Sequence, residues 1–229
     1  MTRKPLFPDI NLALDMDQVI NHFEEKVKAL LADRFPDVVF KNLYEMEVWD
    51  HSRNYTSRSD VTTFLHELFT YPPAGFYLDG MRPVDNLRDI VRSLQGIVNV
   101  WVVSNPLSEI NDASLSITDL QKRDEIWCRV VREKKEWLRV HLQEDAPRFI
   151  PTDSKHVFHG QIIIDDRPDA FDYSKNTGLI HVLYDDNYGF NKNSKNEFRL
   201  SWNMDWENTI QQVIEKVQLT QVPSNLSRH

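Results

Sequence analysis

Two pairs of aspartates each follow a short apolar run, where carboxylates can hold a metal ion or move a proton. Asp15 and Asp17 come directly after INLAL, and Asp165 and Asp166 come directly after III. Ligands of an open α/β sheet bind outside the carboxyl ends of its strands, so acids at those ends can meet at one site. Adjacent carboxylates repel one another unless a cation or a proton intervenes, and such oxygen ligands suit Mg²⁺. Taken singly, either pair is also typical of a turn or a helix cap.

Two further residues have the chemistry to bind a phosphoryl group. Ser104 ends the apolar run VNVWVVS, where its hydroxyl and the N–H groups of the following turn can hold phosphoryl oxygens. Lys134 lies within REKKEW, and a lysine that reaches the acids would offset both phosphate and carboxylate charge. On its own, Ser104 also fits the start of a turn, and most helical lysines are solvated.

Alternating strand and helix patterns position these residues. Short apolar runs predict strands at 10–14, 98–103, 162–164 and 179–184. Helical spacing of apolar residues predicts helices near 23–35, 59–70, 84–95, 120–142 and 205–218. Strands that alternate with helices form a parallel sheet with crossovers, which predicts the α/β class.

The stretch from 22 to 80 interrupts this alternation, because it is helical and loop-rich and has no clear apolar strand. We interpret it as a helical cap inserted into a core formed by residues 1–21 and 81–220. Residues 221–229 are then a polar tail. An ordinary long crossover is the alternative to a cap.

Composition excludes several classes of function. The 229 residues carry 27 Lys and Arg against 35 Asp and Glu, a net charge of −8, which disfavours a general nucleic-acid binder. Cys128 is the single cysteine, so no intrachain disulfide forms and a reducing compartment is expected. No apolar run approaches the length of a membrane helix, and no signal peptide stands out. We therefore expect a cytoplasmic protein without a membrane partner.

The order of these motifs resembles that of the haloacid dehalogenase (HAD) superfamily of phosphotransferases, and their amino-acid sequences resemble those of one family within it. That order is Asp-x-Asp after a strand, a strand ending in Ser, a helical Lys, and a strand ending in Asp-Asp. The segments LDMDQVINHFEE, RFPD, VVSNP, KKEWLRVHL and IIIDDRPD are similar to those of the 5′(3′)-deoxyribonucleotidases. The resemblance runs from about Asn11 to Trp206 and implies a HAD-like Rossmannoid core with a small helical cap.

The resemblance implies a role for each catalytic motif. Asp15 is expected to attack phosphorus and form an aspartyl-phosphate, and Asp17 to act as general acid and base. Mg²⁺ is expected on Asp15, the main-chain carbonyl of Asp17, and Asp166, with Asp165 as a supporting or alternative ligand. Ser104, Asn105 and Lys134 are expected to bind the phosphoryl group, and Lys155 to support the acids.

The resemblance also implies a nucleobase pocket in the cap. Phe23, Trp49, Asp50, His51 and Phe76 fall where the family contacts the base, and Tyr77 continues the same aromatic run. The expected activity is Mg²⁺-dependent 5′-nucleotidase hydrolysis of (deoxy)ribonucleoside monophosphates, with a homodimer suggested by the family. A HAD phosphatase for another small phosphomonoester, such as a sugar phosphate, is one alternative. An inactive HAD-like binding module is another.

Several residues depart from the family pattern. Gln18 replaces a glycine, which predicts either a narrower approach to the phosphate or a negative φ. Asn105 replaces a hydroxyl residue, and Asp50 with His51 makes the base pocket more polar. The segment 107–132 is longer than in the family and is expected to form a longer helix, a lid or a contact surface.

Overall fold

Six parallel strands form one sheet in the order β3-β2-β1-β4-β5-β6. The computed structural model describes residues 4–107, 117–152, 154–168 and 179–221. The strands are β1 (Phe7–Leu14), β2 (Val98–Ser104), β3 (Arg148–Pro151), β4 (Ile162–Asp165), β5 (Ile180–Tyr184) and β6 (Phe198–Leu200). Because neighbouring strands are parallel, their carboxyl ends meet at one edge, and the α/β prediction is confirmed.

The four predicted strands are the central ones, and the two that were missed are the edges. Leu12 and Leu14 of β1 are fully buried, as expected for a parallel strand covered on both faces. Edge strands β3 and β6 have four and three residues and carry Arg148 and Arg199. β3 also ends in Pro151, which an edge strand tolerates because its N–H side needs no partner. Such short, polar segments lack the apolar run that identified the central strands.

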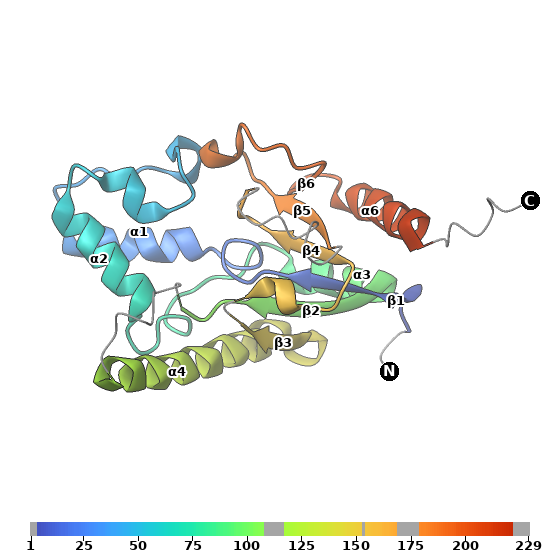
Figure 1. Ribbon diagram of the computed structural model, residues 1–229, viewed down its shortest axis with the longest axis horizontal. Helices are drawn as coiled ribbons and strands as arrows, with labels where there is room; N and C mark the ends of the chain where they lie inside the picture. Colours follow the sequence, from blue (N-terminus) through green and yellow to red (C-terminus); the bar gives the residue numbers. More distant parts are fainter. Residues whose placement is uncertain (1–3, 108–116, 153, 169–178, 222–229) are drawn as a thin grey trace, which may run out of the picture.

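In the described part of the chain, five α-helices cover the sheet or extend beyond it (Figure 1). They are α1 (Phe23–Arg34), α2 (Ser59–Thr70), α3 (Leu87–Ile97), α4 (Ile117–Leu142) and α6 (Trp206–Gln221). All five helix predictions are confirmed, with starts shifted by up to three residues. Residues 117–132 of the lengthened segment extend α4, so the longer-helix expectation is met there. Residues 108–116 and the tail residues 222–229 lie outside the described part of the chain.

Residues 22–80 lie beyond the carboxyl ends of the strands, at the left of Figure 1. They contain α1, α2 and two 3₁₀ helices, η1 (Leu43–Glu45) and η2 (His51–Tyr55), and no strand. The chain leaves and re-enters the core side by side, because Asn21 and Pro83 form an isolated antiparallel bridge. This arrangement agrees with the cap that we propose for residues 22–80.

The cap also touches the far end of the chain. The 3₁₀ helix η6 (Gly189–Asn191) packs against η1. A Cβ atom built on Gly189 would lie 2.5 Å from the carbonyl oxygens of Tyr44 and Met46, so only glycine permits this approach. The position of the cap is therefore set by contacts with both halves of the core.

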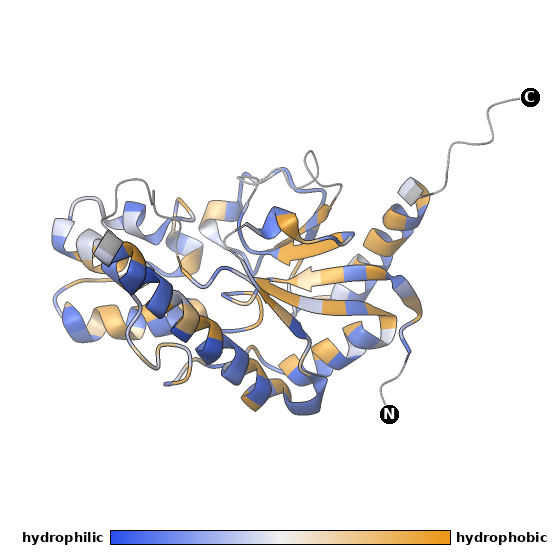
Figure 2. Cartoon of the chain, turned by 60° about the horizontal axis from the view of Figure 1, so that its bottom comes forward, coloured by the Kyte–Doolittle hydropathy of each residue, from blue (hydrophilic) through white to orange (hydrophobic). Residues whose placement is uncertain are grey.

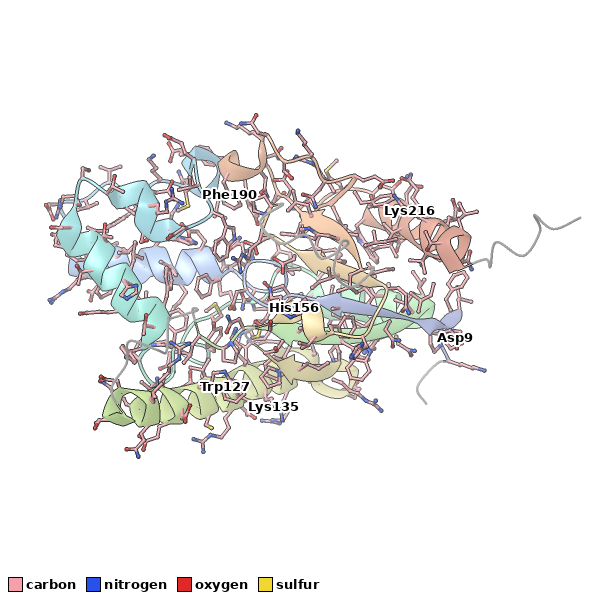
Figure 3. The ribbon with its side chains drawn as sticks, in the orientation of Figure 1. Asp9, Trp127, Lys135, His156, Phe190 and Lys216 are labelled. Atoms are coloured by element: carbon pink, nitrogen blue, oxygen red, sulfur yellow. The ribbon has the colours of Figure 1, made fainter. Side chains whose placement is uncertain are left out.

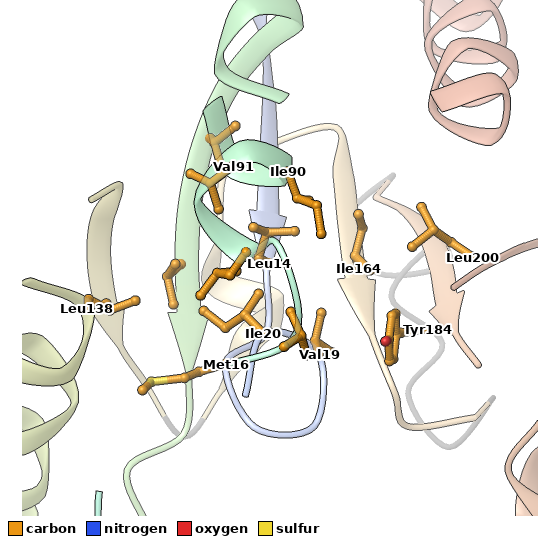
Figure 4. Close-up of a cluster of buried hydrophobic side chains, with 14 of the residues drawn as sticks. Leu14, Met16, Val19, Ile20, Ile90, Val91, Leu138, Ile164, Tyr184 and Leu200 are labelled. Atoms are coloured by element: carbon orange, nitrogen blue, oxygen red, sulfur yellow. The ribbon is translucent and has the colours of Figure 1, made fainter. Parts of the chain in front are cut away.

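A continuous apolar core joins the sheet to its helices. Figure 4 shows Ile90 and Val91 of α3 beside Leu14 of β1 and Ile164 of β4. The central strands are mostly apolar, whereas the helices alternate between apolar and polar faces (Figure 2). No helix among the described residues is both long and apolar enough to cross a lipid bilayer.

Candidate active site

A cavity of about 450 Å³ lies between the carboxyl edge of the sheet and the cap. Most of the residues singled out from the sequence line it. From the core these are Asp15, Asp17, Ser104, Asn105 and Asp166; from the cap they are Phe23, Trp49, Asp50, His51 and Phe76. Lys134 and Asp165 are fully buried behind this lining. One cavity thus joins the strand-end acids to the aromatic side chains of the cap.

Three carboxylates converge at the ends of β1 and β4. One oxygen from each of Asp15, Asp165 and Asp166 lies within 4.8 Å of the others, and all three residues are buried. The Lys155 ammonium reaches into this cluster and lies 2.6 Å from Oδ2 of Asp15 and 2.6 Å from Oδ2 of Asp165. This contact agrees with the expectation that Lys155 supports the clustered acids, because its positive charge offsets their negative charge.

Burial and mutual repulsion disturb the titration of the cluster. Burial raises the pKa of Asp15 to about 6, against the opposing effect of Lys155. Burial, followed by the charges of Asp165 and Asp15, raises the pKa of Asp166 well above its usual range. Burial also acts on Asp165, but Lys155 and His181 outweigh it and hold the pKa of that carboxyl below its usual value.

The three acids fit a hard divalent cation. Their oxygens are close enough to share one ion, and a single Lys155 ammonium leaves the cluster with excess negative charge. An added cation lowers the cost of ionising Asp15 and Asp166, since opposite charge favours the carboxylate. An all-oxygen donor set is the set that Mg²⁺ prefers.

The Asp17 carboxylate is not part of the three-acid cluster and is held by three donors. Lys134 Nζ lies 2.7 Å from Oδ2, the Tyr77 hydroxyl donates to the same oxygen at 2.9 Å, and Asn21 Nδ2 donates to Oδ1 at 3.2 Å. Buried charges require such partners. Asp17 is therefore fixed at the cavity wall, beside but separate from the three clustered acids.

Lys134 connects Asp17 to the end of β2. Its ammonium also donates to Ser104 Oγ at 2.8 Å and to the Asn105 main-chain carbonyl at 2.9 Å. The Asn105 side-chain oxygen accepts a hydrogen bond from the N–H of Leu107, so this oxygen stabilises the turn. Residues predicted separately at the ends of two strands and on one helix thus form one hydrogen-bonded group.

Glu133, the neighbour of Lys134, was missed by the sequence analysis. Its buried carboxylate accepts the N–H of Gly75 at 2.9 Å and that of Tyr77 at 3.4 Å. α4 therefore holds the loop that carries Phe76 and Tyr77, and Tyr77 in turn contacts Asp17. The hydroxyl of Tyr77 was also missed, because the sequence indicated only an aromatic ring. Glu133 is one of several acids along α4, and no local signal separated it from solvated ones.

Gln18 keeps the left-handed backbone that a glycine would adopt. Its φ is 64°, so the expected negative φ is wrong. Its side chain accepts the N–H of Glu24 at 3.0 Å and donates to the Tyr188 hydroxyl at 3.0 Å. These two hydrogen bonds offset the backbone strain and tie the start of α1 to the core.

Aromatic rings line the cap side of the cavity. The Phe23 ring lies 5.8 Å from that of Phe76 and 5.9 Å from that of Phe69. The Trp49 indole donates to Oδ2 of Asp166 at 3.2 Å, and the Arg167 guanidinium lies 4.3 Å from the Trp49 ring centre. Trp49 thus links the cap to the acid cluster.

Two phenylalanines that line this side were not predicted. Phe69 comes from α2, and Phe190, labelled in Figure 3, comes from η6. Phe190 lies far along the chain from the other cap-facing aromatics, so spacing alone gave no reason to group it with them.

The amino-acid sequence is similar to those of a known nucleotidase family. The family described as "5' nucleotidase, deoxy (Pyrimidine), cytosolic type C protein" matches residues 9–218. A "Putative 5'(3')-deoxyribonucleotidase" of Bordetella pertussis is 27% identical over 203 residues, covering 87% of this chain and 94% of that protein. A protein of the same name from Bordetella bronchiseptica is 26% identical over 203 residues, with the same coverage.

Solved structures with a similar fold are more distant in sequence. A haloacid dehalogenase-like hydrolase from Xanthomonas campestris is 10% identical, with a TM-score of 0.45, covering 93% of this chain and 99% of that one. The HAD-hydrolase YfnB from Bacillus subtilis, in a magnesium-bound crystal, is 15% identical, with a TM-score of 0.44, covering 84% and 94%. On the family match over residues 9–218, this chain is a phosphoric monoester hydrolase and belongs to the family of the 5′ nucleotidase, deoxy (pyrimidine), cytosolic type C protein.

Proposed function

We propose that this protein is a Mg²⁺-dependent 5′-nucleotidase that hydrolyses (deoxy)ribonucleoside monophosphates through an aspartyl-phosphate on Asp15. The observation that carries the proposal is the meeting of two different surfaces at one cavity of about 450 Å³. One surface is charged and carries Asp15, Asp17 and the hydrogen-bonded Lys134 and Ser104. The other is aromatic and carries Phe23 and Phe76. A nucleoside monophosphate has the matching pair of ends, a phosphate and a flat base.

The phosphate end reacts in two steps. A carboxylate oxygen of Asp15 attacks phosphorus and the bond to the 5′ oxygen breaks, while Asp17 supplies the proton that the departing oxygen takes up. Asp17 then accepts a proton from the water that attacks phosphorus, which releases inorganic phosphate and restores Asp15. Lys134 and Tyr77 donate to the Asp17 carboxylate and hold it at the cavity wall, where it can accept the proton of the attacking water.

Lys134 offsets part of the negative charge that gathers in these steps, and neutral donors assist it. Ser104 and Lys134 donate to the phosphoryl oxygens, as their mutual contact at 2.8 Å suggests, and Asn105 contributes from the same turn. Mg²⁺, held by Asp15, Asp166 and the main-chain carbonyl of Asp17 with Asp165 in support, supplies the remaining positive charge when it is bound.

The cap holds the base. The half-buried Phe23 offers a ring on which a base stacks, at about 1–3 kcal/mol per base, and the buried Phe76 supports that ring, with ring centres 5.8 Å apart. Trp49 closes the side next to the acids, and Asp50 and His51 give the cavity a polar side. A sugar phosphate would use the charged surface but leave this aromatic surface without a partner.

The test is phosphate release from a panel of monophosphates, with Mg²⁺ and with excess chelator. The panel holds dUMP, dTMP, dCMP, dAMP, dGMP, the ribonucleotides and several sugar phosphates. We expect Mg²⁺-dependent release that favours nucleotides. A preference for sugar phosphates over every nucleotide would keep the phosphatase chemistry and overturn the nucleotide assignment. Phosphate binding without release from any compound would favour an inactive binding module.

A further inference from the structure

A buried acid in the cap takes no part in the chemistry described above. Glu24, on the first turn of α1, is only 5% exposed. Its Oε2 lies 3.0 Å from Nδ1 of His51, which comes from η2. The two atoms are in polar contact by distance, although Oε2 accepts no hydrogen bond of good geometry from the described residues. The contact joins two segments of the cap, α1 and η2.

This pair is costly, so its position calls for a reason. Removing a carboxylate from water is unfavourable unless a partner compensates it, and an apolar pair of the same volume stabilises a fold at least as well. The same turn of α1 carries a solvent-facing counterpart, His22 and Glu25, whose nearest atoms are 4.0 Å apart. The Glu24–His51 pair differs from it by being buried beside the cavity.

His51 forms part of the cavity wall. Its ring lies edge-on to Phe69, with centres 5.5 Å apart, and edge-on to Phe23, with centres 6.4 Å apart. The His51 imidazole is thus in contact with two aromatic rings and one carboxylate, which together restrict its orientation. Because Nδ1 faces Glu24, Nε2 is the ring nitrogen that remains for a ligand in the cavity.

Asp50 adds a second polar group on the same side. Its Oδ1 accepts hydrogen bonds from the N–H of Ser52 at 3.0 Å and from the Ser52 hydroxyl at 2.7 Å, which fixes the start of η2. Asp50, His51 and Ser52 all line the cavity. Carboxylate oxygens accept hydrogen bonds, so a ligand group that meets Asp50 would be an N–H or O–H.

A nucleobase has the complementary chemistry. Its edge carries ring nitrogens, N–H groups and, in most bases, carbonyl oxygens, whereas its faces suit the rings of Phe23 and Phe76. We propose that His51 is the residue that reads the hydrogen-bonding edge of the nucleobase, and that Glu24 is a positioning residue that holds the His51 ring for this task. This inference rests on the proposed nucleotidase function and adds to it a determinant of base recognition.

The test separates base recognition from phosphate chemistry by using two substrates. KM and kcat are measured for the five deoxynucleoside monophosphates and for base-free 2-deoxyribose 5-phosphate. The variants are Glu24→Gln, His51→Phe and the double variant. Phenylalanine keeps the edge contacts with Phe23 and Phe69, and the double variant avoids leaving a buried Glu24 carboxylate without its partner.

We expect the double variant to raise KM for the preferred nucleotide about tenfold, with kcat within about twofold of the wild type. Glu24→Gln should produce a smaller rise in the same direction and reduce the differences between bases. KM for 2-deoxyribose 5-phosphate should stay within about twofold in every variant. The matched control, His22→Asn with Glu25→Gln, should leave both substrates unchanged.

The outcomes distinguish this inference from the function on which it rests. If the wild type releases phosphate from no nucleotide, the proposed function fails and this inference fails with it. If the wild type is active and the variants change both substrates equally, or change neither, the nucleotidase function stands and only the Glu24–His51 role is overturned. A loss confined to nucleotides supports both.

Discussion

Lys155→Met tests the electrostatics of the acid cluster. The Lys155 ammonium lies 2.6 Å from both Asp15 and Asp165, and its side chain is 8% exposed, against 8% and 0% for the two acids. Methionine has a similar length and fits a buried position, but it carries no charge. The substitution therefore leaves Asp15, Asp165 and Asp166 close together without the ammonium.

The magnitude follows from this burial. Removing one partner of a buried ion pair costs about 3–5 kcal/mol, because the other charge stays buried without compensation. For a chain of this size, 1 kcal/mol shifts Tm by about 2–4 °C, so the metal-free variant should unfold about 6–20 °C below the wild type. Mg²⁺ should recover part of this loss, since a cation bound by the acids replaces the missing charge.

The assay is thermal unfolding of wild type and variant in excess chelator and in Mg²⁺. Lys216→Met is the matched control: Lys216 pairs with Glu197 at the surface, where the side chains are 39% and 62% exposed. Exposed pairs contribute at most about 1 kcal/mol, so this variant should stay within about 4 °C of the wild type. A Lys155→Met protein that unfolds within 2 °C of the wild type in chelator would refute the account of the cluster.

Three further predictions concern the same region. Asp15→Asn should lower turnover by about 10⁴-fold or more without loss of the fold, because an amide does not attack phosphorus; near-normal phosphate release would contradict the covalent mechanism. The pKa of Asp15 is raised from 3.8 to about 6 in the metal-free fold. Protonation of Asp15 therefore stabilises this fold fully below about pH 3.8, and about 3 kcal/mol of that stabilisation is lost as the pH rises through 6. The rise in Tm that Mg²⁺ produces should therefore be larger at pH 7.5 than at pH 5, and an equal rise at both would count against this titration. Gln18→Gly should change the free energy of unfolding by no more than about 1 kcal/mol, because relief of the φ of 64° offsets two lost hydrogen bonds. It should nevertheless speed amide exchange at Glu24, whose N–H loses its acceptor, and unchanged exchange would show that the Gln18 side chain does not hold α1.

The candidate site divides into residues that local sequence identified and residues that it did not. Asp15, Ser104 and Asp166 each follow an apolar run, and parallel strands bring their carboxyl ends to one edge. Lys134 and Asp17 meet at 2.7 Å although they are separated by 117 positions in the chain. Their meeting was expected from the order of the motifs, not from either residue alone.

Other features left no local trace. Glu24 and Glu133 look like ordinary helical acids in the sequence, yet both are buried by segments far from them in the chain. Gln18 predicted a negative φ because a side chain disfavours the left-handed backbone, but hydrogen bonds to Glu24 and Tyr188 offset that strain. Each of these outcomes depends on which partners the fold supplies.

The sequence by itself determined the α/β class, the four central strands, and the acids, serine and lysine of the charged surface. It could do so because buried strands need continuous apolar runs and because the chemistry needs particular side chains directly after them. The tertiary structure alone decided the edge strands β3 and β6, the contacts of Glu133 with the loop that carries Tyr77, and the Glu24–His51 pair beside the cavity. These depend on contacts between distant segments, since the energy of a buried charge is set by its neighbours in space and not by those in the chain.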